Sequence, residues 1–545
     1  MGGETVALRV VRKLRDMGVR HVFGVPSGGW VDYMEALRRT DGIDFVLTSH
    51  EGGAGFMADV CGRLTGVPGV CFGTFGPGAT NLATGVGGAL LDRSPMIALT
   101  DEMPAAMRGR VTQMGIDHQA LFAPITKKTM RLDAANVDAI LSDAAAVALA
   151  GRRGPVHVGL PGGLGAQQAG EGHSPVAVAP LPAPEAAQVA ALVAAFRAAR
   201  KPVLAIGLGV TQRGIADGLA ARIAALAERF ALPVVLTPMA KGMLAESHPG
   251  YAGVLFHALS DEVGKTHAEA DLVVAIGYDP VEFNYESWMR DGLPLASIDT
   301  APVDVDRARH PVVAEVVGEI AAGLAALEAV QGPPKAWVLA EVAARKAAMF
   351  RRMRPSAGRM GPCAALEVLR DVLPADGIMT CDVGAHTHLI GQKWATPAPG
   401  LQIMTNGWSA MGFGLPAAIA AKLCRPDKAV CAVVGDGGFL MTVGELATAV
   451  REQLPIVVMV LTDNDLALIR IKQQRKHNPI YGTPVRPEGT IGGPSLFGVP
   501  VTTAATPDSL RAALVAAFAA DGPRIVEVLV DSREYDGLVL RKDKP

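Results

Sequence analysis

The chain has 545 residues, half of them apolar, and its formal net charge is −2. A length of this order exceeds what one hydrophobic core can organise, so we expect three domains of a compact α/β protein. The balanced charge includes no basic stripe that would follow a nucleic-acid backbone. Residues 1–25 read as an amphipathic helix and a strand, and no apolar stretch is long enough for a membrane span. We therefore expect a cytoplasmic protein that binds neither nucleic acid nor membrane.

Short apolar runs alternate with helical patterns along the whole chain, which predicts parallel sheets covered by helices. The first block, residues 1–165, contains the strand-like runs HVFGV, FVLTS, GVCFGTF, MIALT and VHVGL. A linker rich in Gly, Ala and Pro at residues 162–185 leads to a second block, residues 186–330, with PVLAIGL, PVVLTP, LVVAIGY and PLASID. A basic linker then leads to the third block, residues 360–545, with GIMTCDVG, AVCAVVGDGG, IVVMVLTDND and RIVEVLVD. The sequence thus predicts three α/β domains.

Two apolar strands of the third block each end in an acidic loop. The first loop is Gly435, Asp436, Gly437 and Gly438, and the second is Thr462, Asp463, Asn464 and Asp465. Adjacent parallel strands deliver such loops to one crevice at their carboxyl ends, where open α/β sheets bind ligands. Glycines let the backbone approach phosphate oxygens, and Mg²⁺ combines carboxylates with phosphate ligands. Either loop alone is more often an ordinary turn, but the pair across a strand–helix–strand unit predicts a phosphate and metal site.

This pair of loops resembles the signature of thiamine-diphosphate enzymes, in which GDG begins the motif and an Asn-containing loop closes it. The resemblance implies thiamine diphosphate and Mg²⁺ as cofactors. It implies that Asp436 binds the metal through its side chain, that Asp463 supplies the second side-chain ligand, and that Asp465 contributes its main-chain carbonyl. The family usually has Asn at the position of Asp463. Aspartate offers the same oxygen with an additional negative charge, so we expect coordination with a different metal preference.

The segment FVLTSHEGGAGFMADVCGRLTGVPGVCFGTFGPGATN places Glu51 between a strand and a helix. A Glu in a first helical turn usually stabilises the helix dipole at the surface. The segment, however, resembles the pyrimidine-binding domain of the acetohydroxyacid-synthase superfamily, in which HE, GRLTG and GPG-x-TN follow in this order. That resemblance implies that Glu51 is catalytic and activates the cofactor through its aminopyrimidine ring. A carboxyl that exchanges a proton in this role is expected to be partly buried.

Two further segments resemble cofactor contacts of the same family. In NGWSAMGFGLPAAIAA, Met411 takes the place of the residue that props the cofactor in its bent conformation, and the carbonyl of Ser409 faces the cofactor amino group. In CDVGAHTH, His386 falls where relatives contact the diphosphate. Simple core packing is the alternative for Met411, and an ordinary loop histidine is the alternative for His386. His50 and His118 are candidates for substrate contact, although each is more often a hydrogen-bonded structural histidine.

Three segments indicate which reaction of this family the protein catalyses. LVVAIGYDPVEFNYESW and LIRIKQQRKHNP resemble catabolic acetolactate synthases, and the segment that anchors flavin in biosynthetic synthases is not evident, so we expect no FAD. VTQMGIDHQ resembles benzaldehyde lyase in its Q-x-G-I-D pattern, which places Gln113 near the reacting carbon. The leading expectation is a carboligase that decarboxylates a 2-oxo acid such as pyruvate and transfers the acyl unit to a second carbonyl. The alternatives are a 2-hydroxy ketone lyase or ligase, and another 2-oxo acid decarboxylase.

The family resemblance also implies that several copies of the chain assemble into an oligomer. Members build each active site between the first domain of one subunit and the third domain of another, which implies a homodimer or homotetramer. A thiamine-binding relative without catalysis is the non-enzymatic alternative, and the presence of both Glu51 and the metal loops argues against it.

Overall fold

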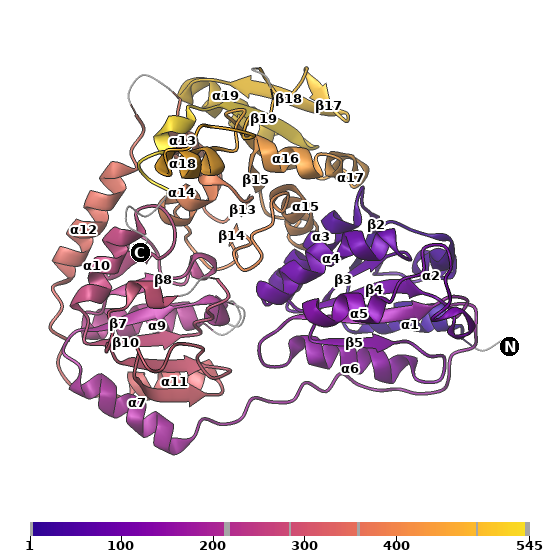
Figure 1. Ribbon diagram of the computed structural model, residues 1–545, viewed down its shortest axis with the longest axis horizontal. Helices are drawn as coiled ribbons and strands as arrows, with labels where there is room; N and C mark the ends of the chain where they lie inside the picture. The colour runs from indigo at the N-terminus through magenta and orange to yellow at the C-terminus, as the bar shows by residue number, and fades with distance from the viewer. Residues whose placement is uncertain (1–3, 212–217, 283–284, 357–359, 487–488, 540–545) are drawn as a thin grey trace.

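The computed structural model describes residues 4–211, 218–282, 285–356, 360–486 and 489–539. Three sheets packed with helices form three successive domains, with the N-terminal domain on the right of Figure 1, the central domain at the lower left and the C-terminal domain at the top. The prediction of three α/β domains with parallel sheets is confirmed. The antiparallel pairing of β17 with β18 at one edge of the third sheet departs from it.

The N-terminal domain holds a six-stranded parallel sheet in the order β2-β1-β3-β4-β6-β5. Its strands are β1 (His21–Gly24), β2 (Asp44–Leu47), β3 (Gly69–Gly73), β4 (Met96–Glu102), β5 (Lys128–Arg131) and β6 (Pro155–Pro161). Its helices are α1 (Val6–Asp16), α2 (Val31–Arg38), α3 (Glu51–Thr65), α4 (Pro77–Leu91), α5 (His118–Phe122) and α6 (Val137–Leu149). The inner strands β3 and β4 are buried along their whole length, as expected for strands covered on both faces.

The central domain follows after residues 162–185, a stretch of the described chain in which no named helix or strand falls. Figure 1 shows this linker crossing along the bottom of the molecule to α7. The central sheet is parallel in the order β12-β11-β10-β7-β8-β9. Its strands are β7 (Pro202–Ile206), β8 (Val234–Leu236), β9 (Tyr251–Val254), β10 (Leu272–Ile276), β11 (Leu295–Asp299) and β12 (Val312–Val317). The helices are α7 (Ala186–Ala198), α9 (Leu219–Phe230), α10 (Ser260–Glu269), α11 (Ile320–Glu328) and α12 (Leu339–Arg352).

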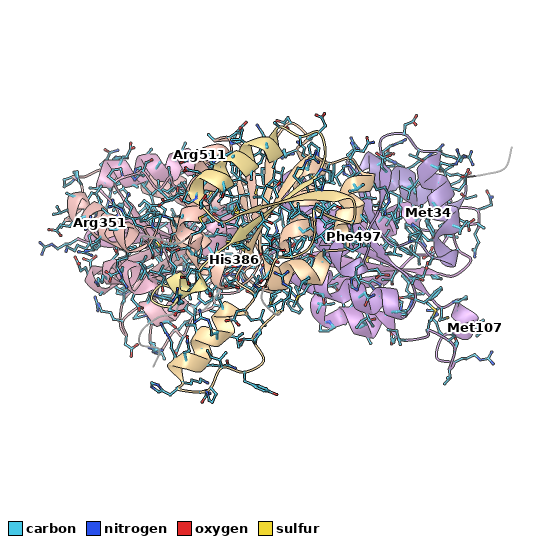
Figure 2. All side chains as sticks on the ribbon, turned by 90° about the horizontal axis from the view of Figure 1, so that it is seen from above. Met34, Met107, Arg351, His386, Phe497 and Arg511 are labelled. Atoms are coloured by element: carbon cyan, nitrogen blue, oxygen red, sulfur yellow. The ribbon has the colours of Figure 1, made fainter. Side chains whose placement is uncertain are left out.

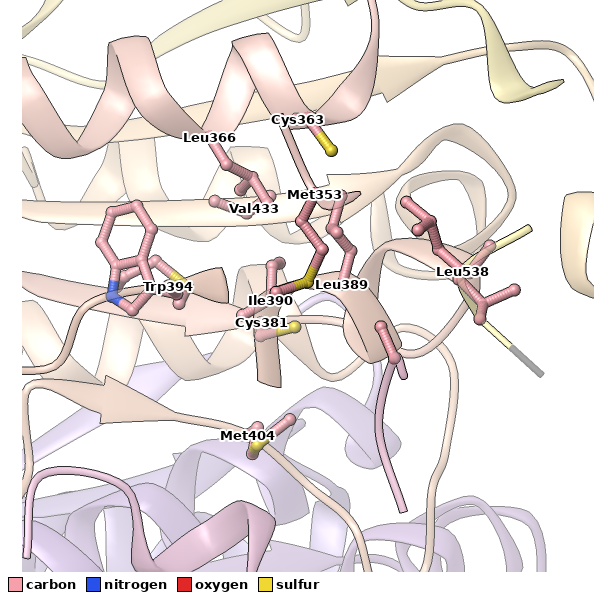
Figure 3. Close-up of a cluster of buried hydrophobic side chains, with 14 of the residues drawn as sticks. Met353, Cys363, Leu366, Cys381, Leu389, Ile390, Trp394, Met404, Val433 and Leu538 are labelled. Carbon is pink, nitrogen blue, oxygen red and sulfur yellow. The ribbon is translucent and has the colours of Figure 1, made fainter. Parts of the chain in front are cut away.

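The C-terminal domain has a seven-stranded sheet in the order β14-β13-β15-β16-β19-β18-β17. Its strands are β13 (Ile378–Cys381), β14 (Gln402–Ile403), β15 (Val430–Gly435), β16 (Ile456–Thr462), β17 (Ser495–Leu496), β18 (Val499–Ala504) and β19 (Arg524–Leu529). Its helices are α13 (Pro362–Val372), α14 (Ala385–Lys393), α15 (Gly414–Cys424), α16 (Asp436–Thr442), α17 (Glu445–Arg451), α18 (Ala467–Arg475) and α19 (Pro507–Phe518). Figure 3 shows part of a hydrophobic cluster that this domain shares with the central domain, in which Trp394, Ile390 and Val433 are buried and Met353 joins from the end of α12.

Helix α3 is the main link between the N-terminal and C-terminal domains. It packs against α4 so closely that a Cβ on Gly55 would lie 2.7 Å from the Cα of Gly85, which explains a glycine at this crossing. It also contacts α15 of the C-terminal domain. There the Sγ atoms of Cys61 and Cys424 lie 2.9 Å apart. The helix that begins with Glu51 is therefore held between two domains.

No helix in the described part of the chain is both long and apolar enough to cross a membrane.

Candidate active site

Two neighbouring strands of the C-terminal sheet bring the predicted acidic loops together. Strands β15 and β16 are parallel and paired from Val430 opposite Ile456 to Gly435 opposite Leu461. Because parallel strands in register end at the same edge of a sheet, the loops that follow them lie side by side. This arrangement matches the crevice expected from the sequence.

The carboxyl groups of Asp436 and Asp463 interact electrostatically in this pair of loops. Asp436 is only 2% exposed, and its Oδ1 and Oδ2 accept hydrogen bonds of 2.8 Å from the N–H groups of Gly437 and Asn464. Burial, followed by the negative charge of Asp436, raises the pKa of Asp463 to about 7. Burial also raises the pKa of Asp436. Because the charge of Asp436 opposes the ionisation of Asp463, a cation bound between the two carboxylates would relieve the repulsion.

Asp465 is held differently from these two aspartates. Its Oδ2 pairs with Nε of Arg470 at 3.0 Å, and its Oδ1 has no hydrogen-bond partner within the described residues. The loop itself is fixed by main-chain hydrogen bonds of 2.9 Å from Leu466 N to Thr483 O and from Val485 N to Asn464 O. Among the described residues, no group of three or more His, Cys, Asp or Glu side chains could hold a metal ion. A metal at these loops would therefore need main-chain or ligand oxygens in addition to the carboxylates of Asp436 and Asp463.

One cavity joins all the residues that the sequence predicted in the C-terminal domain. Its lining includes His386, Ser409, Met411, Gly435, Asp436, Gly437, Gly438, Asp463 and Asp465. The structure therefore brings together four segments, around residues 386, 411, 436 and 464, that are separate in the sequence.

The glycines of the first acidic loop are required by close contacts. A Cβ on Gly438 would lie 2.1 Å from Oδ2 of Asp382, and a Cβ on Gly435 would lie 3.2 Å from Cε1 of His386. His386 is buried, and burial lowers its pKa to about 4, so the imidazole is neutral at pH 7. Its Nε2 has no hydrogen-bond partner within the described residues. This nitrogen, on a residue that lines the cavity, is free to bind a ligand oxygen.

The segment before α15 presents Ser409 and Met411 to the same cavity. Ser409 is exposed and has φ 53°, a left-handed conformation that is uncommon for a residue other than glycine and often found at functional sites. Met411 is half-buried, and its Cε lies 3.4 Å from the place that a Cβ on Gly437 would take. Both predicted residues therefore lie at the cavity that the acidic loops line.

Asp382 was not singled out by the sequence analysis, although it follows strand β13 directly. Its Oδ1 accepts hydrogen bonds from the N–H groups of Val383 at 2.7 Å and Gly412 at 2.9 Å. Burial raises its pKa to about 7. With its close approach to Gly438, this carboxyl connects three of the four segments that line the cavity, those around residues 386, 411 and 436.

The second predicted centre, Glu51, is the first residue of α3 in the N-terminal domain. Its side chain is buried, with the residue 8% exposed, and Oε2 accepts a hydrogen bond of 3.0 Å from Nδ2 of Asn81. A Cβ on Gly78 would lie 3.1 Å from Oε1. The burial expected for this carboxyl is therefore observed. Asn81 belongs to the GPG-x-TN motif, which the sequence analysis noted without giving Asn81 a role.

Gln113 and the two candidate histidines lie in the N-terminal domain as well. Gln113 is exposed in the loop before α5, and the carbonyl of its neighbour Met114 lies close to Gly76. His118 accepts a hydrogen bond of 3.2 Å from the N–H of Gly76 and pairs with Thr100 at 3.0 Å, as a structural histidine does. His50 is the N-cap of α3 and accepts a hydrogen bond of 3.0 Å from the N–H of Gly52.

The two centres are not joined within one chain. None of the described residues that line the cavity comes from the N-terminal domain, so Glu51 and Gln113 do not reach it. Within one chain, Glu51 and Asp436 therefore belong to two separate places.

Comparison with known proteins identifies the family. Residues 4–121 match the N-terminal TPP binding domain of thiamine pyrophosphate enzymes, residues 189–327 match their central domain, and residues 382–528 match their C-terminal TPP binding domain. The chain belongs to the thiamine pyrophosphate enzyme family. This result confirms the resemblance drawn from the sequence and makes the protein a thiamine-diphosphate-dependent enzyme that forms or breaks carbon–carbon bonds.

Curated relatives cover nearly the whole chain. An acetolactate synthase of Bacillus subtilis is 30% identical over 98% of this chain and 94% of its own length. A probable 2-ketoarginine decarboxylase, AruI, of Pseudomonas aeruginosa is 34% identical over 96% of this chain and 94% of its own length. A catabolic acetolactate synthase of Raoultella terrigena is 30% identical over 96% of this chain and 95% of its own length. The motif that suggested this last group includes residues 283–284, which lie outside the described residues.

The C-terminal cavity fits the diphosphate end of this cofactor. The glycines of the first acidic loop allow close approach of phosphate oxygens, and the unpartnered Nε2 of His386 can bind one of them. The donor set of Asp436, Asp463 and the Asp465 carbonyl consists of hard oxygen atoms, which Mg²⁺ combines with phosphate oxygens. These residues can therefore hold a metal and a diphosphate together.

Proposed function

We propose that the protein is a carboligase that decarboxylates a 2-oxo acid such as pyruvate and transfers the acyl unit to a second carbonyl compound. The observation that carries this proposal is the cavity lined by the two acidic loops, His386, Ser409 and Met411, together with a buried Glu51 on another domain. The near-full-length similarity to acetolactate synthases supports the choice of substrates. FAD is not expected to take part.

In this proposal the thiamine ring, once bound, supplies a nucleophilic carbon. The chain's own residues bind and activate it. Asp436, Asp463 and the carbonyl of Asp465 hold Mg²⁺ against the diphosphate, with Gly435, Gly437, Gly438 and His386 around the phosphate oxygens. Met411 and the Ser409 carbonyl orient the aminopyrimidine. The Glu51 carboxyl exchanges a proton with the ring nitrogen, and Gln113 lies beside the reacting substrate.

We further propose a homodimer or homotetramer, in which Glu51 of one subunit meets the Asp436 cavity of another. Apolar side chains are exposed beside both half-sites, as at protein interfaces. In the loop that contains Gln113 these are Met107, Val111, Met114 and Ile116, and near the cavity they are Leu440, Met441 and Ile469. Figure 2 shows Met107 projecting at the outer edge of the N-terminal domain. Contact between the two sets in different subunits would bury both and complete the site.

A second candidate is a decarboxylase that releases an aldehyde without ligation. It is favoured by the 34% identity to the probable 2-ketoarginine decarboxylase. The two functions share the decarboxylation step and differ in what the acyl unit joins, a proton or a second carbonyl.

The test is to incubate the enzyme, thiamine diphosphate and Mg²⁺ with pyruvate and with a panel of other 2-oxo acids and aldehydes. Release of carbon dioxide and the identity of the product are measured. Carbon dioxide with acetolactate from pyruvate supports the carboligase. Carbon dioxide with only an aldehyde identifies the decarboxylase instead. Cleavage of a 2-hydroxy ketone without carbon dioxide release would identify a lyase of the benzaldehyde-lyase type.

A further inference from the structure

A second buried glutamate, Glu445, lies against the turn that precedes Glu51. It is the first residue of α17 in the C-terminal domain and is only 1% exposed. Its Oε1 accepts hydrogen bonds from the N–H groups of His50 at 3.1 Å and Ser49 at 3.2 Å. Its Oε2 accepts the Ser49 N–H at 3.2 Å and the hydroxyl of Thr448 at 2.7 Å. One carboxylate of the C-terminal domain thus binds two consecutive peptide groups of the N-terminal domain.

These peptide groups belong to the start of α3. The first N–H groups of a helix and its N-cap lack partners within the helix, and a negative charge near them is favourable. A carboxylate from the same domain commonly fills this role, whereas here it comes from a segment 395 residues further along the chain. The contact therefore couples the orientation of the β2–α3 turn to the C-terminal domain.

Gly53, in the first turn of α3, shows how closely the carboxylate fits. A Cβ on Gly53 would lie 2.4 Å from Oε1 of Glu445, closer than real Cβ contacts. The carboxylate lies directly against the backbone of the helix that begins with Glu51, and any side chain at residue 53 displaces it.

Two further hydrogen bonds join the segment around α17 to residues 47–49, and neither involves the N–H groups of Ser49 and His50. Nη1 of Arg451 donates a hydrogen bond of 2.7 Å to the carbonyl of Leu47. The hydroxyl of Ser49 donates to the carbonyl of Gly444 at 2.7 Å. A substitution can therefore remove the hydrogen bond of Arg451 without removing those of Glu445.

We propose that Glu445 is a positioning residue that sets the direction of the Glu51 side chain through the Ser49 and His50 peptide groups. The proposal rests on the proposed role of Glu51 in activating the cofactor. The two peptide groups immediately precede Glu51, so their orientation fixes where its Cα–Cβ bond points. A displacement of about 1 Å in a catalytic group is enough to lower the rate about a hundredfold.

The test compares Glu445→Gln with the wild-type protein and with Arg451→Met, the matched control that removes a neighbouring interdomain hydrogen bond. Glutamine keeps the volume of Glu445 but replaces one acceptor oxygen with an N–H donor facing the Ser49 N–H. Two quantities are measured without any 2-oxo acid. The first is the exchange rate of the thiazolium C2 proton of bound thiamine diphosphate in D₂O, by quenched NMR. The second is amide hydrogen exchange of residues 47–53 in the cofactor-free protein, by mass spectrometry.

We expect Glu445→Gln to slow C2 proton exchange by at least about tenfold, with the Kd for thiamine diphosphate changed by less than about threefold. We also expect faster amide exchange at residues 49–50. Arg451→Met is expected to match the wild type in C2 exchange. Gly53→Ala is a second variant, since its methyl group displaces the intact Glu445 carboxylate, and it should slow C2 exchange as well.

The positioning role would be overturned if Glu445→Gln exchanged the C2 proton at the wild-type rate. It would also be overturned if Arg451→Met slowed this exchange as much as Glu445→Gln does. A wild-type protein that exchanges C2 no faster than free cofactor would instead contradict the activation by Glu51 on which it rests. The two failures are therefore distinguishable.

Discussion

The main-chain N–H of Asn464 donates a hydrogen bond of 2.8 Å to Oδ2 of Asp436 and so joins the loop after β16 to the loop after β15. Asn464 has φ 60°, a left-handed conformation that asparagine tolerates better than most residues. The bond fixes the spacing of the two acidic loops through the backbone. The side chain of Asp463, in the loop after β16, accepts at Oδ1 a hydrogen bond of 3.1 Å from the N–H of Asp465.

Asp463→Asn is expected to stabilise the protein without metal and to reduce the gain that metal and cofactor bring. Burial and the charge of Asp436 raise the pKa of Asp463 to about 7, and the amide removes this repulsion while keeping an oxygen ligand. The thermal midpoint is measured with and without Mg²⁺ and thiamine diphosphate, and after EDTA treatment. An increase on adding both ligands that equals or exceeds that of the wild type would contradict the assignment.

Glu51→Gln is expected to lower kcat by at least about a hundredfold, the lower range for loss of a general acid or base. The amide keeps the shape of the side chain and its contact with Asn81, so the Kd for thiamine diphosphate should stay nearly unchanged. Steady-state kinetics and calorimetric titration measure the two effects. Glu35→Gln, at the exposed Glu35–Arg38 pair on α2, is the control and should behave as the wild type. Substantial turnover by Glu51→Gln would show that another group activates the cofactor.

Gly438→Ala is expected to weaken binding of thiamine diphosphate by at least about tenfold. The added Cβ would lie 2.1 Å from Oδ2 of Asp382, and relieving such a clash in a packed region costs about 1–3 kcal/mol. The Kd is measured by calorimetry at saturating Mg²⁺. Gly493→Ala is the matched control because a Cβ there, apart from its chain neighbours, meets no atom of the described residues within 4 Å. Equal affinities for both variants would argue that residue 438 lies away from the diphosphate.

Asp101→Asn tests the pH dependence of stability. Burial raises the pKa of Asp101 to about 6, against the hydrogen bonds from the hydroxyls of Ser27 and Thr74. Between about pH 4 and pH 6 the folded protein therefore binds more protons at this site than the unfolded chain, and the wild type loses up to about 3 kcal/mol relative to the variant as pH rises. The thermal midpoint of the variant minus that of the wild type should increase from pH 4.5 to pH 7.5. A constant difference would show that burial does not perturb this carboxyl.

All inner strands of the three sheets except β18 could be predicted from the sequence, because strands covered on both faces are continuous apolar runs. Strands β5, β9, β12, β14, β17 and β18 were not predicted. Five of these six lie at a sheet edge, and β18 lies next to the two-residue edge strand β17. Strands β5 and β12 are partly exposed, and their sequences KTMR and VVAEVV include charged residues. Edge strands depend on pairing with a neighbour rather than on a local apolar pattern.

The residues of the site also divide into those that a local sequence motif predicts and those that depend on contacts with distant parts of the chain. The acidic loops and Glu51 lie within short motifs, so their residues could be predicted. Asp382 and Glu445 could not, because their roles consist of contacts with Gly412 and His50, which lie 30 and 395 residues away in the chain. Neither of these contacts can be recognised from a local sequence pattern.

The claim that Glu51 and the Asp436 cavity meet between subunits is tested most directly by complementation. Glu51→Gln and Asp436→Ala chains, each with its own affinity tag, are coexpressed, and oligomers carrying both tags are purified and assayed. Each variant alone should be inactive. A mixed dimer would contain one intact site out of two, so we predict about half of the wild-type activity. Mixed oligomers as inactive as the single variants would contradict a site shared between subunits.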